Sequence, residues 1–110
     1  MPLDTLSFET TVVSENRIQI PAKIAQSLGY QPREKVTLTA GTQDSSVYIN
    51  VFPGEDKDKG AVRSLSGVKV GEKEYAQLVI PIAFVRMFGL AGKELSWYVK
   101  QNHAVIEVPQ

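Results

Sequence analysis

Positively charged side chains beside turns and helix starts are the residues of this chain best suited to binding a partner. Such side chains donate hydrogen bonds to phosphate oxygens, and the forked guanidinium group of an arginine also fits the edge of guanine. Arg17 follows a predicted turn, and Lys23 lies near the start of a predicted short helix, where anions are attracted. The sequence therefore predicts a phosphate-binding set made of Arg17, Lys23, Arg86, Lys69 and Lys73.

Each of these cations can also be an ordinary surface residue. Arg86 can cover apolar surface with its stem, and acidic residues close in sequence can neutralise the other charges. Arg33 and Lys35 form a further basic pair, which Glu34 counters. The acidic residues near the predicted set are Glu9, Glu15, Glu72 and Glu74.

Residue sets for catalysis or metal binding are missing from the sequence. The chain has no cysteine and a single histidine, His103, which we place at a turn. A lone histidine without spaced carboxylates or thiolates makes no metal site, and the chain has no glycine-rich phosphate loop. We therefore expect neither an enzyme nor a protein with a metal or a cofactor.

The composition indicates a globular chain with balanced charge. Its 110 residues are 43% hydrophobic, which is enough for a core. Lys and Arg number 12, Asp and Glu also number 12, and the sequence pI is about 6.6. This argues against a generally basic nucleic-acid binder but leaves room for a local basic patch. Because no run of 18 apolar residues and no signal peptide is recognisable, we expect a cytoplasmic protein without a transmembrane helix.

The elements that would position these cations are built on a unit that occurs twice. In the first copy, Ile18 and Ile20 alternate with polar residues, as in a half-buried strand. Pro21 ends that strand and can begin a helix, because the first helical position needs no backbone N–H. Gly29 is placed to end the helix in the left-handed conformation. Residues of the two copies correspond as Pro21 with Pro81, Ile24 with Phe84, Leu28 with Phe88, and Gly29 with Gly89.

Further predicted strands complete each half as strand–strand–helix–strand–strand. We expect the first repeat over 8–52, with a polar turn over 41–46, and the second repeat over 67–109. An exposed linker over 53–66 joins them. An internal repeat of this kind indicates that the two copies complete one core together. The predicted fold is mostly β with two short helices, in a single domain over 1–110, arranged as a pseudo-twofold β-barrel of two ββαββ repeats.

The repeated unit resembles the swapped-hairpin family of AbrB, SpoVT and MazE. The family pattern places an arginine and two aliphatic residues before the proline, Leu-Gly after the helix, and Pro-Gly-acidic before the next strand. The chain departs from the family pattern at three positions. Asn16 and Arg33 stand where the family has glycine, and Gln77 stands where the family has arginine. The matching residues are Arg17, Ile18, Ile20, Pro21, Ile24, Leu28, Gly29, Pro32, Glu34, Val36 and Leu38 in the first half, and Leu78, Ile80, Pro81, Phe84, Phe88, Gly89, Leu90, Gly92, Leu95 and Trp97 in the second.

The resemblance implies a DNA-binding transcription regulator. In the family, two chains each supply one ββαββ unit and interlock into a barrel, so two copies in one chain look like a fused version, similar to MraZ-like and RIFT-type cradle-loop barrels. The resemblance identifies Arg17 as the hairpin arginine and Arg86 as one member of an arginine pair after the proline. The implied partner is double-stranded DNA.

Two alternatives stay open at this point. The barrel can close between two chains, as a homodimer that exchanges halves through residues 53–66. The chain can also be a protein-interaction or antitoxin-like module that kept the barrel without the DNA-binding face.

Overall fold

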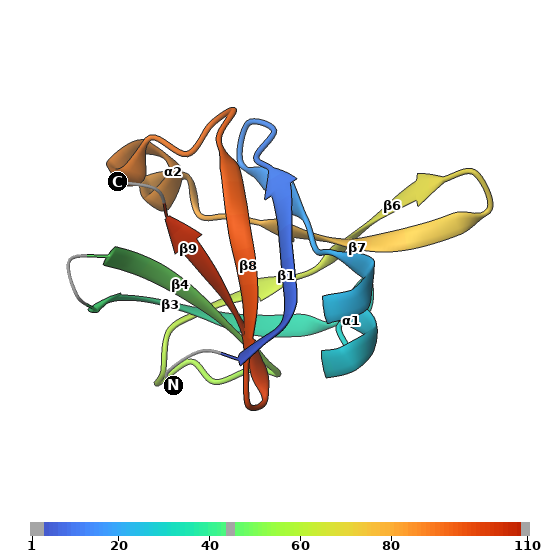
Figure 1. Ribbon diagram of the computed structural model, residues 1–110, viewed down its shortest axis with the longest axis horizontal. Helices are drawn as coiled ribbons and strands as arrows, with labels where there is room; N and C mark the ends of the chain where they lie inside the picture. Colours follow the sequence, from blue (N-terminus) through green and yellow to red (C-terminus); the bar gives the residue numbers. More distant parts are fainter. Residues whose placement is uncertain (1–3, 44–45, 109–110) are drawn as a thin grey trace.

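The computed structural model describes residues 4–43 and 46–108, and within them the chain is mostly β-strand with two short helices (Figure 1). This confirms the prediction of a mostly β chain with two short helices. In chain order the elements are β1 (Asp4–Val12), β2 (Arg17–Gln19), α1 (Ala22–Leu28), β3 (Lys35–Gln43), β4 (Ser46–Pro53), β5 (Ala61–Ser64), β6 (Ser66–Val70), β7 (Lys73–Val79), α2 (Ile82–Phe88), β8 (Glu94–Lys100) and β9 (His103–Val108). No helix in these described ranges is long and apolar enough to cross a membrane.

The strands form two antiparallel sheets. The larger sheet has six strands in the order β1-β8-β9-β4-β3-β5, and the smaller has three in the order β2-β7-β6. The two sheets are not closed into a barrel by strand pairing among the described residues. Strands from different halves pair in both sheets, with Ile18 opposite Leu78 in β2–β7 and Asn50 opposite Val105 in β4–β9. Neither half therefore forms a sheet of its own.

Proline and glycine set the limits of both helices, as the sequence predicts. Pro21 and Pro81 precede the helices with φ of −55° and −53°, values that the pyrrolidine ring imposes. Gly29 and Gly89 end them in the left-handed region, with φ of 76° and 61°. Glycine adopts this conformation without the steric cost that a Cβ atom brings.

Corresponding residues of the two halves have corresponding surroundings just before the prolines. The Ile20 N–H donates to the Ala76 carbonyl at 3.0 Å, and the Ile80 N–H donates to the Asn16 carbonyl at 2.7 Å. Both isoleucines are fully buried. Each half thus supplies the hydrogen-bond acceptor for the other, which ties the two hairpins together across β2 and β7.

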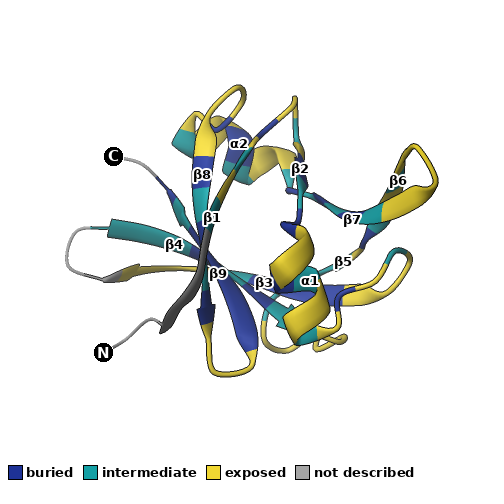
Figure 2. Cartoon of the chain, turned by 45° about the vertical axis from the view of Figure 1, so that its right-hand side comes forward, coloured by how far each residue is buried: buried dark blue, intermediate teal, exposed yellow. Residues whose placement is uncertain are grey.

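A single hydrophobic core takes residues from both halves. Buried positions concentrate where the strands of the two sheets meet, whereas the outer sides of both helices are exposed (Figure 2). The Trp97 Nε1–H donates to Thr11 Oγ1 at 2.8 Å, so the one polar atom of this buried indole is satisfied. The largest fully buried side chains are Trp97, Ile18, Ile20, Ile24, Leu38, Ile49, Leu65, Leu78, Ile80, Leu90, Leu95 and Ile106.

The segment over 53–66, predicted to be an exposed linker, is partly built into the fold. Strand β5 lies within it and pairs with β3, and Leu65 is only 2% exposed. The Thr37 hydroxyl, itself buried, donates to the Gly54 carbonyl at 2.8 Å. The linker prediction is therefore wrong for residues 61–65, because their apolar side chains and free backbone groups complete the edge beside β3.

The polar turn predicted over 41–46 is also shorter than expected. Strand β3 continues to Gln43 and β4 begins at Ser46, with Gly41 opposite Tyr48 in the ladder. Residues 44–45 lie outside the described residues. Cross-strand pairing here overrides the low strand propensity of the polar residues, which depends strongly on context.

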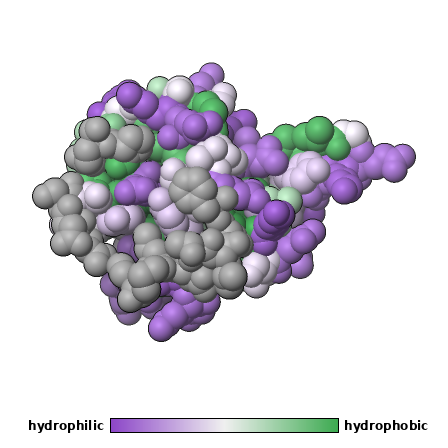
Figure 3. Space-filling view, viewed as in Figure 1, coloured by the Kyte–Doolittle hydropathy of each residue, from purple (hydrophilic) through white to green (hydrophobic). Residues whose placement is uncertain are grey.

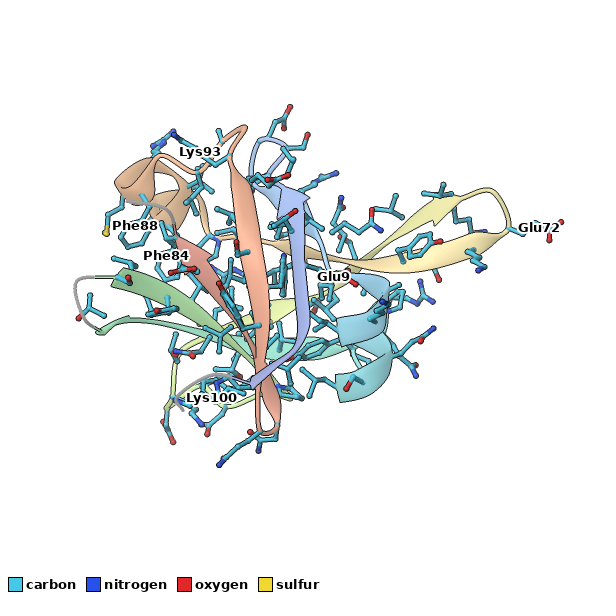
Figure 4. The ribbon with its side chains drawn as sticks, viewed as in Figure 1. Glu9, Glu72, Phe84, Phe88, Lys93 and Lys100 are labelled. Atoms are coloured by element: carbon cyan, nitrogen blue, oxygen red, sulfur yellow. The ribbon has the colours of Figure 1, made fainter. Side chains whose placement is uncertain are left out.

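Strands β6 and β7 extend beyond the rest of the molecule as an arm, which we define as residues 66–76 (Figure 1). Its ladder runs from Ser66 opposite Gln77 to Val70 opposite Lys73, and Gly71 turns the chain at the tip with φ of 67°. Side chains near the tip are exposed (Figure 2), and Glu72 points away from the body (Figure 4). Both faces of the arm are therefore accessible near its tip, whereas Ala76 at its base is buried.

Candidate nucleic-acid interface

The three-stranded sheet has one buried face and one face that remains accessible. Residues of β7 alternate, so that Ala76 and Leu78 are buried while Tyr75 and Gln77 are half-buried. Directly opposed residues on neighbouring strands share a face, so the register extends the accessible face across all three strands. We call it the outer face; its residues are Arg17, Gln19, Ser66, Val68, Val70, Lys73, Tyr75, Gln77 and Val79.

Two of the five predicted cations lie on the outer face, near its two ends. Arg17 is exposed on β2 opposite Val79, and Lys73 is exposed at the start of β7. Six residue steps of β7 separate Val79 from Lys73, which at 3.3 Å per residue corresponds to about 20 Å. That distance matches the rise of about six base pairs of duplex DNA.

Uncharged hydrogen-bonding groups occupy the middle of the outer face. Gln19 lies opposite Gln77, and the Ser66 hydroxyl lies 3.3 Å from Gln77 Oε1. Tyr75 continues the row toward the arm tip. Amide and hydroxyl groups of this kind bind sugar and phosphate oxygens or base edges without adding charge.

Lys69 lies on the opposite face of the arm and has an acidic neighbour. It pairs in register with Glu74, whose carboxylate forms a two-pronged ion pair with Arg33 at 3.1 and 3.2 Å. The hydrogen bond from Arg33 holds the pKa of the Glu74 carboxyl below its usual value, and the charges of Arg33 and Lys69 act in the same direction. The Lys69 ammonium group is thus partly neutralised and does not extend the cationic outer face.

The remaining two predicted cations lie on the helices. Lys23 is exposed in the first turn of α1. Arg86 is exposed in the last turn of α2, where a positive charge interacts favourably with the helix dipole. Because α2 lies at the other end of the molecule from the arm (Figure 1), Arg86 is not brought together with Lys69 and Lys73.

A groove of about 460 Å³ runs between α1 and the arm. Ala22, Ala25 and Gln26 line it from the helix, and Lys73, Glu74, Tyr75 and Ala76 line it from β7. Small side chains on the helix leave the groove open, whereas Lys73 and Tyr75 belong also to the outer face. Glu74 and Ala76 belong to the opposite face of β7, so the groove borders both faces of the sheet.

The Arg33–Glu74 ion pair is the part of this region that the sequence did not predict. Glu34 was expected to counter Arg33, but the partner comes from a residue far along the chain. Arg33 has φ of 74°, a left-handed conformation that is costly for a residue with a Cβ atom. The one sequence signal for this position was that Arg33 stands where the family pattern has a glycine.

His103 is not a turn residue, contrary to the sequence prediction. It begins β9 and is 8% exposed, and its ring stacks on Phe52 with 4.2 Å between the ring centroids. Nε2 lies 3.3 Å from Asn50 Oδ1, and the Lys59 ammonium group lies 3.7 Å from the centre of the Phe52 ring. Burial lowers the pKa of His103, and the positive charges of Lys100 and Lys59 lower it further. His103 thus packs against β4, and Lys59 contacts the same Phe52 ring.

No group of three or more histidine, cysteine or acidic side chains that could hold a metal ion occurs in residues 4–43 and 46–108. Comparisons with known proteins return no match, whether to a protein-family model, to a curated protein or to a solved structure.

Proposed function

We propose that the protein is a DNA-binding transcription regulator of the AbrB/SpoVT/MazE type, with two ββαββ units fused in one chain. The proposed arrangement is a pseudo-twofold barrel whose approximate axis passes between Ile18 and Leu78 and between Asn50 and Val105. Support comes from the strand register, because each of these pairs joins corresponding strands of the two halves. The reciprocal hydrogen bonds of Ile20 and Ile80 fit the same axis.

The single observation that carries the function is the placement of Arg17 and Lys73 on one accessible sheet face. Two cations about 20 Å apart span several phosphates of one strand. The amides of Gln19 and Gln77 between them can contact the sugar-phosphate backbone or base edges. Because the chain has no net charge, binding relies on this local arrangement rather than on general attraction.

In the proposed complex the outer face lies along the DNA backbone. Arg17 donates to phosphate with its forked guanidinium group and fixes the register of the sheet, and Lys73 acts as a point charge at the arm. Lys23, on the exposed side of α1, can reach the flanking phosphates. Arg86 lies on α2, away from the arm, and would contact DNA only if the duplex extended along the body.

Fluorescence anisotropy with labelled duplexes across a salt series tests the proposal. Each phosphate contact contributes about −0.9 to the slope of log affinity against log salt. The double variant Arg17→Ala/Lys73→Ala should therefore make the slope shallower by about 1.8. The matched control is Lys57→Ala/Lys93→Ala, which removes the same net charge from exposed positions outside the outer face.

Two results contradict the proposal. One is the absence of binding to any duplex at low salt. The other is an equal loss of slope in the control, because that would show general charge attraction rather than contact through the outer face.

A second candidate function is a protein-interaction module, and the outer side of α2 favours it. Ile82 and Met87 are 52% and 70% exposed there, while Phe84 and Phe88 lie on the inner side toward the sheet (Figure 4). The corresponding positions of α1 hold the small residues Ala22 and Ser27. Capture of one defined protein that is lost on Met87→Lys, with DNA binding absent, would decide for this function.

A further inference from the structure

The arm leaves one backbone edge without a partner. Leu65 donates its N–H to Glu34 and accepts from Arg33, so its backbone groups point away from β7. Because backbone groups alternate along a strand, those of Gly67 and Lys69 point to this same side. Strand β6 is the last strand of its sheet in the described residues, and Figures 1 and 2 show no segment beside its outer edge.

We propose that this edge pairs with the same edge of a second copy of the chain. The two β6 strands run antiparallel with Val68 opposite Val68 of the second copy, which joins two three-stranded sheets into one of six strands. Gly67 of the first copy and Lys69 of the second copy exchange two backbone hydrogen bonds. Lys69 of the first copy and Gly67 of the second copy exchange two more. Four backbone hydrogen bonds thereby satisfy groups that the single chain leaves to water.

The side chains on the outer face fit this pairing. Val68 lies opposite Tyr75 within the arm, so the pairing produces an uninterrupted row of Tyr75, Val68 and their two counterparts. Val70, which is 58% exposed, extends the apolar surface beside that row. Figure 3 shows apolar surface on the arm, between hydrophilic parts of the tip and the body. Aromatic and β-branched residues in adjacent cross-strand positions stabilise antiparallel sheets.

On the opposite face of the arm, the pairing brings acidic side chains of one copy next to basic side chains of the other. The Glu74 carboxylate lies over Gly67, since a Cβ atom added at Gly67 would be 2.3 Å from Glu74 Oε2. In the proposed register Lys69 of the second copy lies opposite Gly67 and therefore next to this carboxylate. Each Glu74 then has a lysine on both sides, with Arg33 holding it in place.

Neighbouring registers lack this complementarity. A pairing centred on Lys69 sets two lysines directly against each other, which is unfavourable. A pairing centred on Gly67 requires Leu65, whose backbone groups already bond to Glu34 and Arg33. Only the register centred on Val68 uses the free groups of Gly67 and Lys69 and alternates the charges.

Sedimentation velocity over a concentration series tests the pairing. The wild-type chain should form a dimer, and Lys69→Pro should weaken it by about 30-fold, because each chain loses one outward-facing N–H donor. Proline is accepted at such a position, since that N–H makes no bond within the chain. Lys69→Ala keeps the N–H and serves as the matched control, with a smaller loss of a fewfold. A wild-type chain that stays monomeric at several hundred micromolar overturns the proposal, and so does a dimer that Lys69→Pro leaves intact.

Amide hydrogen exchange of the unmodified chain gives a second, variant-free test. The Gly67 and Lys69 amides should exchange at least tenfold more slowly at concentrations where the dimer forms than at low concentration. A dimer built by exchange of halves through residues 53–66 would leave these two amides equally fast at both concentrations, which would overturn the edge pairing.

Discussion

The two hairpins of this chain differ far more than the helices that follow them. In the first hairpin, Ser14 and Arg17 exchange backbone hydrogen bonds at 2.8 and 2.9 Å, so the turn closes at once. In the second, Ser66 and Gln77 occupy the corresponding places, and the chain continues to a tip at Gly71 before it returns. The first hairpin is thus a tight turn, whereas the second extends into the arm.

The backbone around the two hairpins is nevertheless the same. Gly92 donates to the Val13 carbonyl at 2.9 Å, and Arg33 donates to the Leu65 carbonyl at 2.7 Å. The two donors have nearly equal φ, 78° and 74°, although only one of them is glycine. The two halves therefore share one framework, and the arm is an addition to the second half.

The largest expected effect comes from breaking the framework at its centre. Leu78 is fully buried and lies opposite Ile18 where the halves meet, so Leu78→Ala should lower the free energy of unfolding by about 3 kcal/mol. Val70→Ala in the exposed part of the arm should change it by no more than about 0.5 kcal/mol. Urea denaturation followed by circular dichroism measures both, and equal losses would show that the arm belongs to the framework.

The pH dependence of stability tests a residue of the body, His103 in β9. Burial and the nearby lysines lower the folded-state pKa of His103, so the unfolded chain takes up a proton near pH 6.5 while the folded chain does not. Stability should therefore be constant above that pH and fall as pH drops from 6.5 toward the folded-state pKa. His103→Gln should abolish this fall in thermal denaturation scans between pH 5 and 7, where no other histidine titrates. An unchanged profile in the variant would show that the pKa of His103 does not differ between the folded and unfolded states.

A smaller effect is expected at the connector before β3. Arg33→Gly should raise the thermal midpoint by a few degrees, because glycine adopts a φ of 74° without steric cost. The same change removes the ion pair with Glu74, which is exposed and contributes little. The control is Arg33→Lys, which keeps the positive charge and also keeps a Cβ atom in the left-handed conformation. A lower midpoint for Arg33→Gly would mean that the ion pair, not the backbone, dominates this position.

The smallest effect on stability should follow removal of the arm itself. Replacing residues 66–76 with Ser14-Glu15-Asn16, the turn of the first hairpin, should leave the thermal midpoint nearly unchanged. The same variant should lose salt-dependent DNA binding, since Lys73 and most of the outer face are gone. Unfolding of this variant would contradict the division into framework and arm, and undiminished DNA binding would move the interface elsewhere.

Individual elements of this fold were predictable because their causes are local. Alternation around Ile18 and Ile20 indicated a half-buried strand, and Pro21 and Gly29 indicated where a helix begins and ends. Strand β5 was missed because Ala61–Ser64 follows a polar, mixed-charge run. Its strand conformation depends on the open edge of β3, which no local pattern displays.

The candidate site was only partly predictable for the same reason. The sequence marked Arg17 and Lys73 as exposed cations but could not decide that they share a sheet face, since that depends on the register of β2 against β7. It also could not separate Lys69 from them, because its neighbour Glu74 is held by Arg33 from the other half.

The sequence alone determined two copies of a strand, proline, short helix and glycine, because φ restrictions and side-chain periodicity act within a few residues. The pairing of β2 with β7 and of β4 with β9 became evident only in the folded chain, and so did the extension of one hairpin into an arm with an accessible face. Those choices depend on burial and hydrogen bonding between segments far apart in the chain, whose free energy exists only once both segments are in place.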